Sequence, residues 1–354
     1  MSQFFPLQLA MLRRDTPDSL VLTLTVPDEH RARFVHQPGQ HLTLRAELSG
    51  DEIRRSYSLC NASGTAMLQL AIKRVPGGRF SSWVHSQLRE GDWLQAAPPT
   101  GNFALPVVPQ ARRHYAAFAA GSGIAPVMSV LESTLRDERH SRFTLVYCNR
   151  DLASVQFREH LWELKDRYLD RFRVLYLFSK ETQDVDLFGG RLDQARCAAL
   201  IASCLPATQI DHAYLCGPAG MMDSVAAALQ AAGLGAEQIR RERFAASAPR
   251  PASCEARTPA ASGSVDLLVQ QEGARRRLSL PPSGDTLLDA MLKAGLAPRY
   301  SCKAGVCATC RCKVLAGDVE MYEPHALDPA EVAAGYVLSC RSRARSQHLE
   351  LALD

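Results

Sequence analysis

Four cysteines in the C-terminal part of the chain constrain its fold more than any other feature. Cys302, Cys307 and Cys310 have the spacing C-x4-C-x2-C, and Cys340 follows in a later segment. This spacing is typical of plant-type [2Fe–2S] clusters, in which one loop supplies three thiolates and a distant segment supplies the fourth. The loop has to bend closely around the irons so that its N–H groups point at the sulfurs, and Gly305 permits such an approach.

A structural zinc site is the alternative, because zinc also binds four thiolates. Zinc sites usually pair two short C-x2-C motifs, whereas this sequence has one, Cys307 to Cys310. Cys312 fits no position of the ligand spacing. The total of 11 cysteines is high for a cytosolic protein unless some bind metal. The sequence therefore favours the iron–sulfur cluster. The remaining cysteines are scattered: Cys60, Cys148, Cys197, Cys204, Cys216 and Cys254.

The length of 354 residues predicts two or three domains. In residues 1–108, short segments alternate between apolar and polar residues at 20–26, 41–44 and 67–72, with turn signals between them. Regularly spaced short strands of this kind predict a small antiparallel β-barrel.

Residues 109–245 follow a different pattern, in which strands alternate with helices. Strands are predicted at 143–147 and 173–178, and helices at 126–136 and 154–168. This alternation predicts a doubly wound parallel α/β sheet.

The segment 246–264 is rich in Ala, Pro, Ser, Gly and Arg and has no apolar period, which is typical of a linker. Residues 265–354 form the third predicted domain, which holds the clustered cysteines. The sequence thus predicts three domains and one linker.

Within the predicted barrel, Arg55, Tyr57 and Ser58 form an R-x-Y-S motif on a strand. Alternate residues share one face of a strand, so this segment can offer a cation to phosphates and hydroxyls to the edge of a flavin ring. Seen alone, the motif also fits an ordinary surface strand.

A second motif of the barrel is the glycine turn at Gly78, which opens a predicted helix carrying Phe80 and Ser81. The first turn of a helix presents free N–H groups to a pyrophosphate. A helix capped by Ser81 is the alternative. Because the two motifs occur in this order on one barrel, together they indicate a flavin site.

Two turns of the α/β segment lie where a strand passes into a helix. At the C-terminal ends of parallel strands such turns flank one crevice, which suits a dinucleotide. The first turn, at 121–126, contains only part of the G-x-G-x-x-G motif of dinucleotide-binding proteins, so it is weak evidence by itself. An inert buried thiol is generically the commoner case for a residue such as Cys216 in the second turn, but its position before Gly217 favours a place beside the nicotinamide. The residues expected to contact the nicotinamide cofactor are Gly121, Gly123, Pro126, Cys216, Gly217 and Pro218.

Polar residues follow two further strands, with Arg150 after the first and Ser179 and Lys180 after the second. Cations at these strand ends suit a 2′-phosphate and favour NADPH over NADH. Solvated surface charges are the alternative.

Composition excludes several classes of protein. The net charge of +4 is small and dispersed, so no nucleic-acid partner is expected. The N-terminus lacks the features of a secretory signal. The longest uncharged run, 115–131, is shorter than the ~20 residues of a membrane span. We expect a cytoplasmic protein with no membrane segment.

The order of these motifs resembles the ferredoxin–NADP reductase superfamily with a fused C-terminal plant-type ferredoxin. Segments 38–44, 54–58, 77–81, 242–244, 307–310 and 333–340 are similar to the reductase subunits of phenylacetyl-CoA epoxidase complexes. The resemblance implies a flavin barrel, a doubly wound NADP domain and an α+β β-grasp ferredoxin domain. It also implies three cofactors, FAD, NADPH and a [2Fe–2S] cluster.

The resemblance assigns roles to individual residues. It implies that Ser58, Cys216 and Glu242 are catalytic, and that Phe244 packs near the free face of the flavin. FAD would be held by Arg55, Tyr57, Ser58, Gly78, Phe80 and Ser81. Two positions depart from the family pattern: Ala125 replaces a usual threonine, and Cys148 replaces a usual glycine beside Arg150.

The expected function is an NAD(P)H-dependent electron-transfer component of a multicomponent oxygenase. By resemblance, the partner is a di-iron oxygenase subunit that acts on phenylacetyl-CoA in aerobic phenylacetate degradation. A reductase for a Rieske dioxygenase or a steroid hydroxylase is the alternative within the same class. A non-catalytic ferredoxin-type electron carrier is the alternative from another class.

Overall fold

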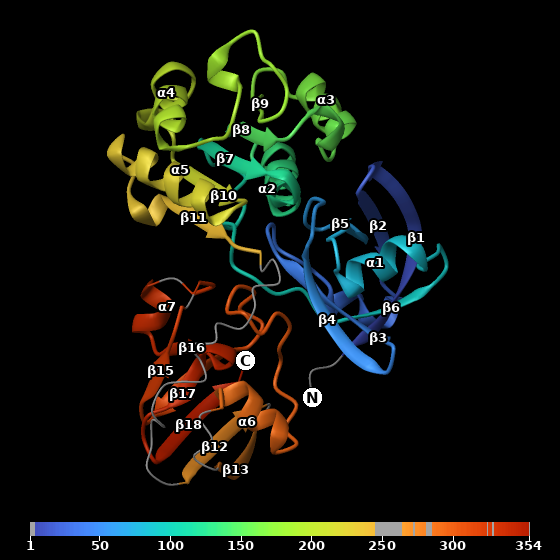
Figure 1. Cartoon of the computed structure of the whole chain (residues 1–354), viewed down its shortest axis with the longest axis vertical. Coiled ribbons are helices and arrows are strands. Elements are labelled where there is room, and N and C mark those ends of the chain that lie inside the picture. Colours follow the sequence, from blue (N-terminus) through green and yellow to red (C-terminus); the bar gives the residue numbers. More distant parts are fainter. Residues whose placement is uncertain are drawn as a thin grey trace. The chain divides into compact units, whose positions relative to one another are not determined.

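The computed structural model describes residues 4–244, 264–271, 273–280, 285–323, 325–327 and 329–353. The chain divides into two compact units, one formed by Phe4–Glu242 and one that begins at Arg243 (Figure 1). The predicted linker, 246–264, lies outside the described residues except for its last residue, and Cys254 lies outside them too. Within the described ranges, none of the helices combines the length and apolar character that a bilayer crossing requires.

The first part of the larger unit is an antiparallel barrel, as predicted. Its strands have the order β4-β3-β6-β1-β2-β5, and a bridge between Leu59 and Leu70 links the two end strands. A short helix, α1 (Arg79–Ser86), follows β5. The strands are β1 (Phe5–Thr16), β2 (Ser19–Thr25), β3 (His41–Leu48), β4 (Asp51–Ser58), β5 (Met67–Lys73) and β6 (Trp93–Ala96).

Strand β2 is buried on both faces, although its sequence alternates in part between leucine and threonine. Leu20, Leu22 and Leu24 belong to the core inside the barrel. Val21 points the other way and packs in the core of the α/β part. The strand therefore forms part of the contact between the two halves of this unit.

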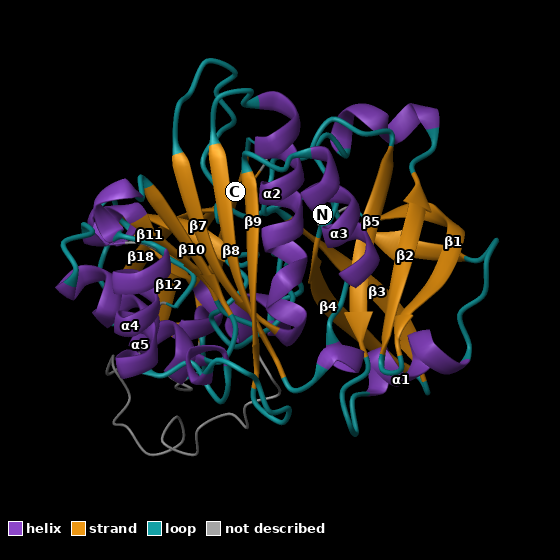
Figure 2. Cartoon of the chain, turned by 90° about the horizontal axis from the view of Figure 1, so that it is seen from above, coloured by secondary structure: helices purple, strands orange, loops and turns teal. Residues whose placement is uncertain are grey.

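The second part of the larger unit is a parallel sheet with the order β11-β10-β7-β8-β9. Helices α2 and α3 pack in the core on one face, and α4 and α5 pack in the core on the other (Figure 2). The elements are β7 (His114–Ala120), α2 (Ile124–Asp137), β8 (Arg142–Asn149), α3 (Arg158–Arg167), β9 (Phe172–Phe178), α4 (Gln194–Cys204), β10 (His212–Cys216), α5 (Ala219–Ala231) and β11 (Ile239–Glu242). This is the predicted doubly wound arrangement.

The predicted start of α3 at residue 154 is wrong, because the helix begins at Arg158. Asp151 and Ser154 close a separate 3-10 turn by a reciprocal capping box. Phe157 then adopts a left-handed conformation with φ 57°, which a continuous helix does not allow.

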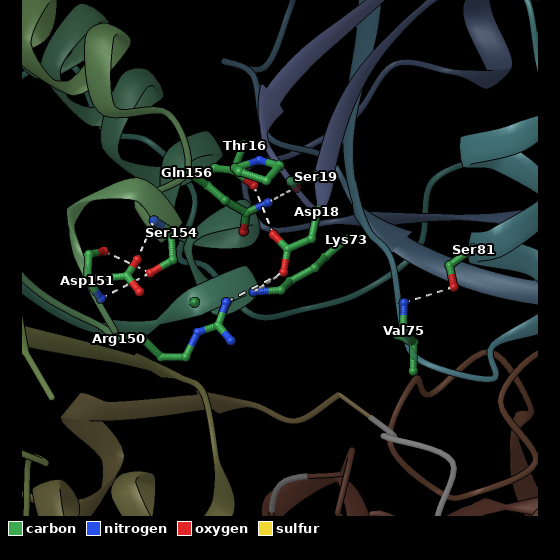
Figure 3. Close-up of polar contacts among 12 residues, drawn as sticks. Thr16, Asp18, Ser19, Lys73, Val75, Ser81, Arg150, Asp151, Ser154 and Gln156 are labelled. Carbon is green, nitrogen blue, oxygen red and sulfur yellow. Dashed lines mark hydrogen bonds and ion pairs between the residues drawn. The ribbon is translucent and has the colours of Figure 1, made fainter. Parts of the chain in front are cut away.

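Hydrogen bonds that are buried or partly buried join the barrel to the α/β part. The Gln156 amide donates to Ser19 Oγ at the start of β2 (Figure 3). The Phe157 N–H donates to Asp15 Oδ2 over 2.9 Å. On the neighbouring helix α2, Glu132 Oε2 accepts the N–H of Ala62 over 2.9 Å. These contacts hold the two halves of the unit together.

The smaller unit is an α+β domain built on a mixed sheet with the order β13-β12-β18-β14-β16. Its core includes Leu267, Met291 and Leu351, from two strands and the helix α6. β12 and β18 are parallel, and the other pairs of this sheet are antiparallel. The elements are β12 (Val265–Gln271), β13 (Ala274–Leu280), α6 (Leu287–Lys293), β14 (Arg311–Ala316), β15 (Val319–Met321), α7 (Pro329–Ala333), β16 (Tyr336–Leu338), β17 (Ser342–Ala344) and β18 (His348–Leu353).

Candidate functional site

The predicted flavin motif lies at the C-terminal end of β4. Arg55 is exposed, Tyr57 is half-buried and Ser58 is buried. The Tyr57 ring packs against the buried ring of Phe80, with 5.8 Å between centroids. Burial raises the pKa of Tyr57 well above its ordinary value, so the phenol stays neutral and can donate a hydrogen bond.

The glycine turn before α1 is shaped by close backbone packing. A Cβ at Gly78 would lie 3.0 Å from the carbonyl oxygen of Val75 and 2.7 Å from Ser81 Oγ. The Ser81 hydroxyl is buried and accepts the Val75 N–H over 3.1 Å (Figure 3). Ser81 therefore braces the turn with its side chain. Gly78 is the N-cap of α1 and has no side chain to cap it, so the first N–H groups of the helix can meet a phosphate.

The two predicted nicotinamide turns pack directly against one another. A Cβ at Gly123 would collide with the carbonyl oxygen of Cys216, and one at Gly217 would lie 3.0 Å from the Ala120 Cβ. The Tyr147 hydroxyl donates to the carbonyl of Gly121 over 3.1 Å and fixes the first turn. Glycine at 123 is therefore required for the ends of β7 and β10 to meet, and the space at 217 is tight.

Two other residues that were predicted to contact the nicotinamide cofactor lie at the starts of helices, next to these turns. Pro126 is buried in the first turn of α2, and Pro218 is exposed as the N-cap of α5. Ala125, which departs from the threonine that the resemblance led us to expect, is buried next to Pro126. Cys148 packs on the opposite face of the sheet with the core that contains Cys197, and burial raises its pKa to about 12.

The three residues predicted as catalytic come together at the edge of the sheet. Cys216 on β10 is paired in register with Glu242 on β11. Ser58 Oγ of the barrel donates to Glu242 Oε2 over 3.4 Å. The Cys216 side chain is fully buried, and burial raises its pKa well above the ordinary value, so the thiol is neutral. Glu242 is only partly buried as a residue, yet the burial of its carboxyl group raises the pKa to about 8.

The variant Glu242→Gln is expected to remove a pH dependence of stability. A carboxyl with a pKa of about 8 in the folded state and an ordinary value of 4.5 keeps a proton that the unfolded chain loses between these pH values. The free energy of unfolding of the wild type should therefore fall, relative to the variant, as pH rises through this window. The expected change is up to a few kcal/mol, since one pKa unit corresponds to about 1.4 kcal/mol.

Chemical denaturation at pH 5 and pH 8 measures this difference. Glu237→Gln, at an exposed position before β11, is the matched control and should follow the wild type. Parallel pH profiles for the wild type and Glu242→Gln would show that burial does not hold the proton.

The predicted phosphate-binding residues are brought side by side at the ends of β8 and β9. The N–H of Lys180 donates to the carbonyl of Arg150 over 2.8 Å, and that of Ser179 donates to the Asn149 carbonyl over 3.0 Å. All three predicted residues, Arg150, Ser179 and Lys180, are exposed. The Arg150 guanidinium lies 3.8 Å from the Asp18 carboxylate, a contact that the sequence did not predict.

The four predicted cluster cysteines lie in the smaller unit as two close pairs. Cys302 and Cys307 are within hydrogen-bonding reach of each other, and so are Cys310 and Cys340. Among the residues that the structure describes, no three His, Cys, Asp or Glu side chains form a ready-made metal site. The four thiols therefore form two hydrogen-bonding pairs that lie close enough to interact electrostatically.

The backbone of the cysteine loop fits an iron–sulfur cluster. Lys303, Gly305 and Ala308 all have positive φ, between 49° and 75°, so the loop curls tightly. The Ala304 N–H donates to Cys302 Sγ over 3.3 Å. Hydrogen bonds from the Cys307 thiol and from several backbone N–H groups lower the pKa of Cys302. A loop that aims N–H groups at a thiolate is what the cluster sulfurs require.

Arg341 is a residue of this loop region that sequence reasoning missed. It is 9% exposed and follows Cys340 directly. Its guanidinium donates to the carbonyl of Ala304 over 3.2 Å, and its Cγ lies 2.8 Å from where a Cβ of Gly305 would be. No spacing motif indicates such a contact, which joins the loop to a distant segment.

Phe244, predicted to pack near the flavin, is 44% exposed. It belongs to the smaller unit, whereas Ser58 and Tyr57 belong to the larger one. Its position beside the flavin stays a prediction.

Family models match three parts of the chain. Residues 7–105 match an oxidoreductase FAD-binding domain, residues 118–227 an oxidoreductase NAD-binding domain, and residues 269–345 a 2Fe-2S iron-sulfur cluster binding domain. These matches agree in order and kind with the barrel, the α/β part and the cysteine-bearing unit.

Curated relatives match over nearly the whole chain. One component of the 1,2-phenylacetyl-CoA epoxidase from Escherichia coli (strain K12) is 40% identical over 97% of this chain and 95% of that protein. The ferredoxin reductase component of 3-ketosteroid-9-alpha-monooxygenase from Rhodococcus rhodochrous is 33% identical over 98% of this chain and 95% of its own length.

A solved structure has the same set of domains. Phthalate dioxygenase reductase, described as a modular structure for electron transfer from pyridine nucleotides to [2Fe–2S], gives a TM-score of 0.60 at 24% identity. The match covers 99% of this chain and 98% of that one. At this identity the likeness supports the fold.

Proposed function

Because this chain belongs to the family of oxygenase reductases that join FAD-binding, NAD-binding and 2Fe–2S domains, we propose that it passes electrons from NADPH to a di-iron oxygenase acting on phenylacetyl-CoA. The main structural support for a role in electron transfer is that Ser58, Cys216 and Glu242 meet at one edge of the sheet in the larger unit. The identity to a phenylacetyl-CoA epoxidase component supports the choice of acceptor.

When bound, FAD accepts a hydride from the nicotinamide and the cluster relays single electrons. The residues of the chain would bind and orient these cofactors. Tyr57 and Ser58 would bind the flavin ring by their hydroxyls, and the N–H groups that follow Gly78 would bind the pyrophosphate. The absence of side chains at Gly123 and Gly217 lets the two turns pack together beside Cys216, where the nicotinamide would bind.

Glu242 would hold a proton at its carboxyl group near neutral pH, because burial raises its pKa to about 8. Through Ser58 this carboxyl is linked to the predicted flavin strand. In the smaller unit, Cys302, Cys307, Cys310 and Cys340 would be the iron ligands.

The preference for NADPH is proposed from Arg150 and Lys180, which lie side by side at the strand ends. Arg150→Ala should raise the KM for NADPH by about tenfold, because one charge-assisted contact to the 2′-phosphate is lost, and should change the KM for NADH little. Steady-state kinetics with ferricyanide as acceptor measure both values. Arg173→Ala, at the other end of β9, is the control and should leave both unchanged. Equal increases for both nucleotides would remove Arg150 from the phosphate site.

The choice of acceptor is tested by reconstitution. NADPH oxidation should become dependent on phenylacetyl-CoA when the purified protein is mixed with the di-iron oxygenase of a phenylacetyl-CoA epoxidase. A 3-ketosteroid oxygenase is the competing acceptor, since its reductase is 33% identical to this chain. Coupling to the steroid enzyme alone would contradict the proposal. Absence of NADPH turnover by FAD-loaded protein would favour a non-catalytic electron carrier.

A further inference from the structure

Asp18 lies in the turn between β1 and β2 and is held as a carboxylate by its neighbours. Thr16 Oγ1 lies 3.0 Å from Asp18 Oδ1, and Lys73 Nζ lies 3.3 Å from Asp18 Oδ2. Burial alone would raise the pKa of Asp18, but Lys73, Thr16 and Arg150 together hold it below the ordinary value. The group therefore carries a negative charge near neutral pH.

The same carboxylate reaches across to the α/β part. Arg150 lies 3.8 Å from Asp18 Oδ2, and Figure 3 shows the Asp18 carboxylate pointing at both cations. The Arg150 side chain is 56% exposed, so it can turn toward a ligand in solvent. Lys73 stays close to Asp18 on the neighbouring strand β5 and can balance its charge after Arg150 has moved.

The loss of this ion pair would leave the rest of the contact between barrel and α/β part in place. Gln156 still bonds Ser19, and the Phe157 N–H still bonds Asp15. Since these bonds are buried or partly buried and do not involve Arg150, the ion pair can break without separating the two parts.

We propose that Asp18 limits the preference for NADPH by competing with the 2′-phosphate of the nucleotide for Arg150. This inference rests on the proposed role of Arg150. A phosphate bound at Arg150 must either displace the carboxylate or lie close to a second anion, and each of these weakens binding. NADH carries no phosphate at this position, so Asp18 should not affect its binding.

The test is the variant Asp18→Asn, which keeps the shape of the side chain and removes its charge. We expect the KM for NADPH to fall by about 1.5- to fivefold, the range typical of one exposed ion pair, with the KM for NADH unchanged. Inhibition by 2′-AMP should strengthen by a similar factor, whereas inhibition by 5′-AMP should not. The decrease in the KM for NADPH, which is the gain from the substitution, should be smaller at high salt, because exposed charges are screened.

Asp28→Asn is the matched control. Asp28 follows the other end of β2 and pairs with Arg31 over 2.9 Å, so the variant makes the same change of charge away from Arg150. Its KM values for NADPH and NADH should equal those of the wild type.

The double variant Asp18→Asn/Arg150→Ala shows whether Asp18 affects NADPH binding through Arg150. If Asp18 acts through Arg150, the gain for NADPH disappears when Arg150 is absent. A gain that persists there, an equal gain for NADH, or no gain in the single variant would each overturn the inference. The proposed function would still stand if Arg150→Ala alone discriminated between the two nucleotides. If it did not, this inference and the proposed phosphate role of Arg150 would both fall, whereas the proposed electron transfer to an oxygenase would still rest on its own reconstitution test.

Discussion

In the variant Cys307→Ser, electron transfer from NADPH to the oxygenase is expected to fall by roughly a hundredfold or more, while reduction of ferricyanide by NADPH persists. Changes near a metal site commonly cost about ten- to a hundredfold in affinity even outside the ligands, and Cys307 is a predicted ligand. The residue lies in the smaller unit, whereas Ser58, Cys216 and Glu242 lie in the larger one. The substitution therefore changes no residue of the predicted hydride site.

Iron and labile-sulfide analysis, the visible spectrum and assays with both acceptors measure the effect. Cys312→Ser is the matched control, because Cys312 is fully buried on β14 in the core of the same domain. It should keep the cluster and lose about 1–3 kcal/mol of stability from the buried hydroxyl. Normal transfer to the oxygenase by Cys307→Ser would exclude the cluster from the electron path.

Gly123→Ala should strongly damage the larger unit. The new Cβ would overlap the carbonyl oxygen of Cys216 and lie 3.1 Å from the Gly217 nitrogen. These are backbone atoms and cannot turn away as a flexible side chain would, so the end of β10 and the start of α2 must separate. We expect kcat/KM for NADPH to fall about a hundredfold, as for displacements of about 1 Å at other active sites.

Overpacking of this kind also costs about 1–3 kcal/mol of stability, which thermal unfolding would detect. Gly220→Ala is the control, because a Cβ at Gly220 meets no atom within 4 Å and the residue lies in the first turn of α5. That variant should keep its activity and gain slightly in stability, since alanine favours helices. An active Gly123→Ala enzyme would show that the close meeting of the two turns is dispensable.

Features that depend on short stretches of sequence were predictable. The cysteine spacing predicted the loop, and strand–helix alternation predicted the parallel sheet. The sequence also placed β2 correctly to within one residue, because its apolar residues alternate in the period of a strand. The start of α3 was missed because the left-handed backbone at Phe157 has no sequence signal of its own.

Contacts between distant segments were not predictable from residue patterns. Ser58 and Glu242 are 184 positions apart, and only the family resemblance gave Glu242 a role in the same reaction as Ser58. The pairing of Asp18 with Arg150 depends on how the barrel packs against the end of β8, which neither segment encodes alone. Arg341 was missed for the same reason, since its partners lie in the cysteine loop.

The fit between Gly305 and Arg341 has a consequence for second-site suppression. Gly305 has φ 75°, and its missing Cβ leaves the space that Arg341 Cγ fills. Two separate demands therefore keep this position a glycine, one from backbone torsion and one from steric exclusion. Shortening Arg341 would relieve only the second, so a Gly305→Ala defect should be rescued partly and never fully by trimming its neighbour.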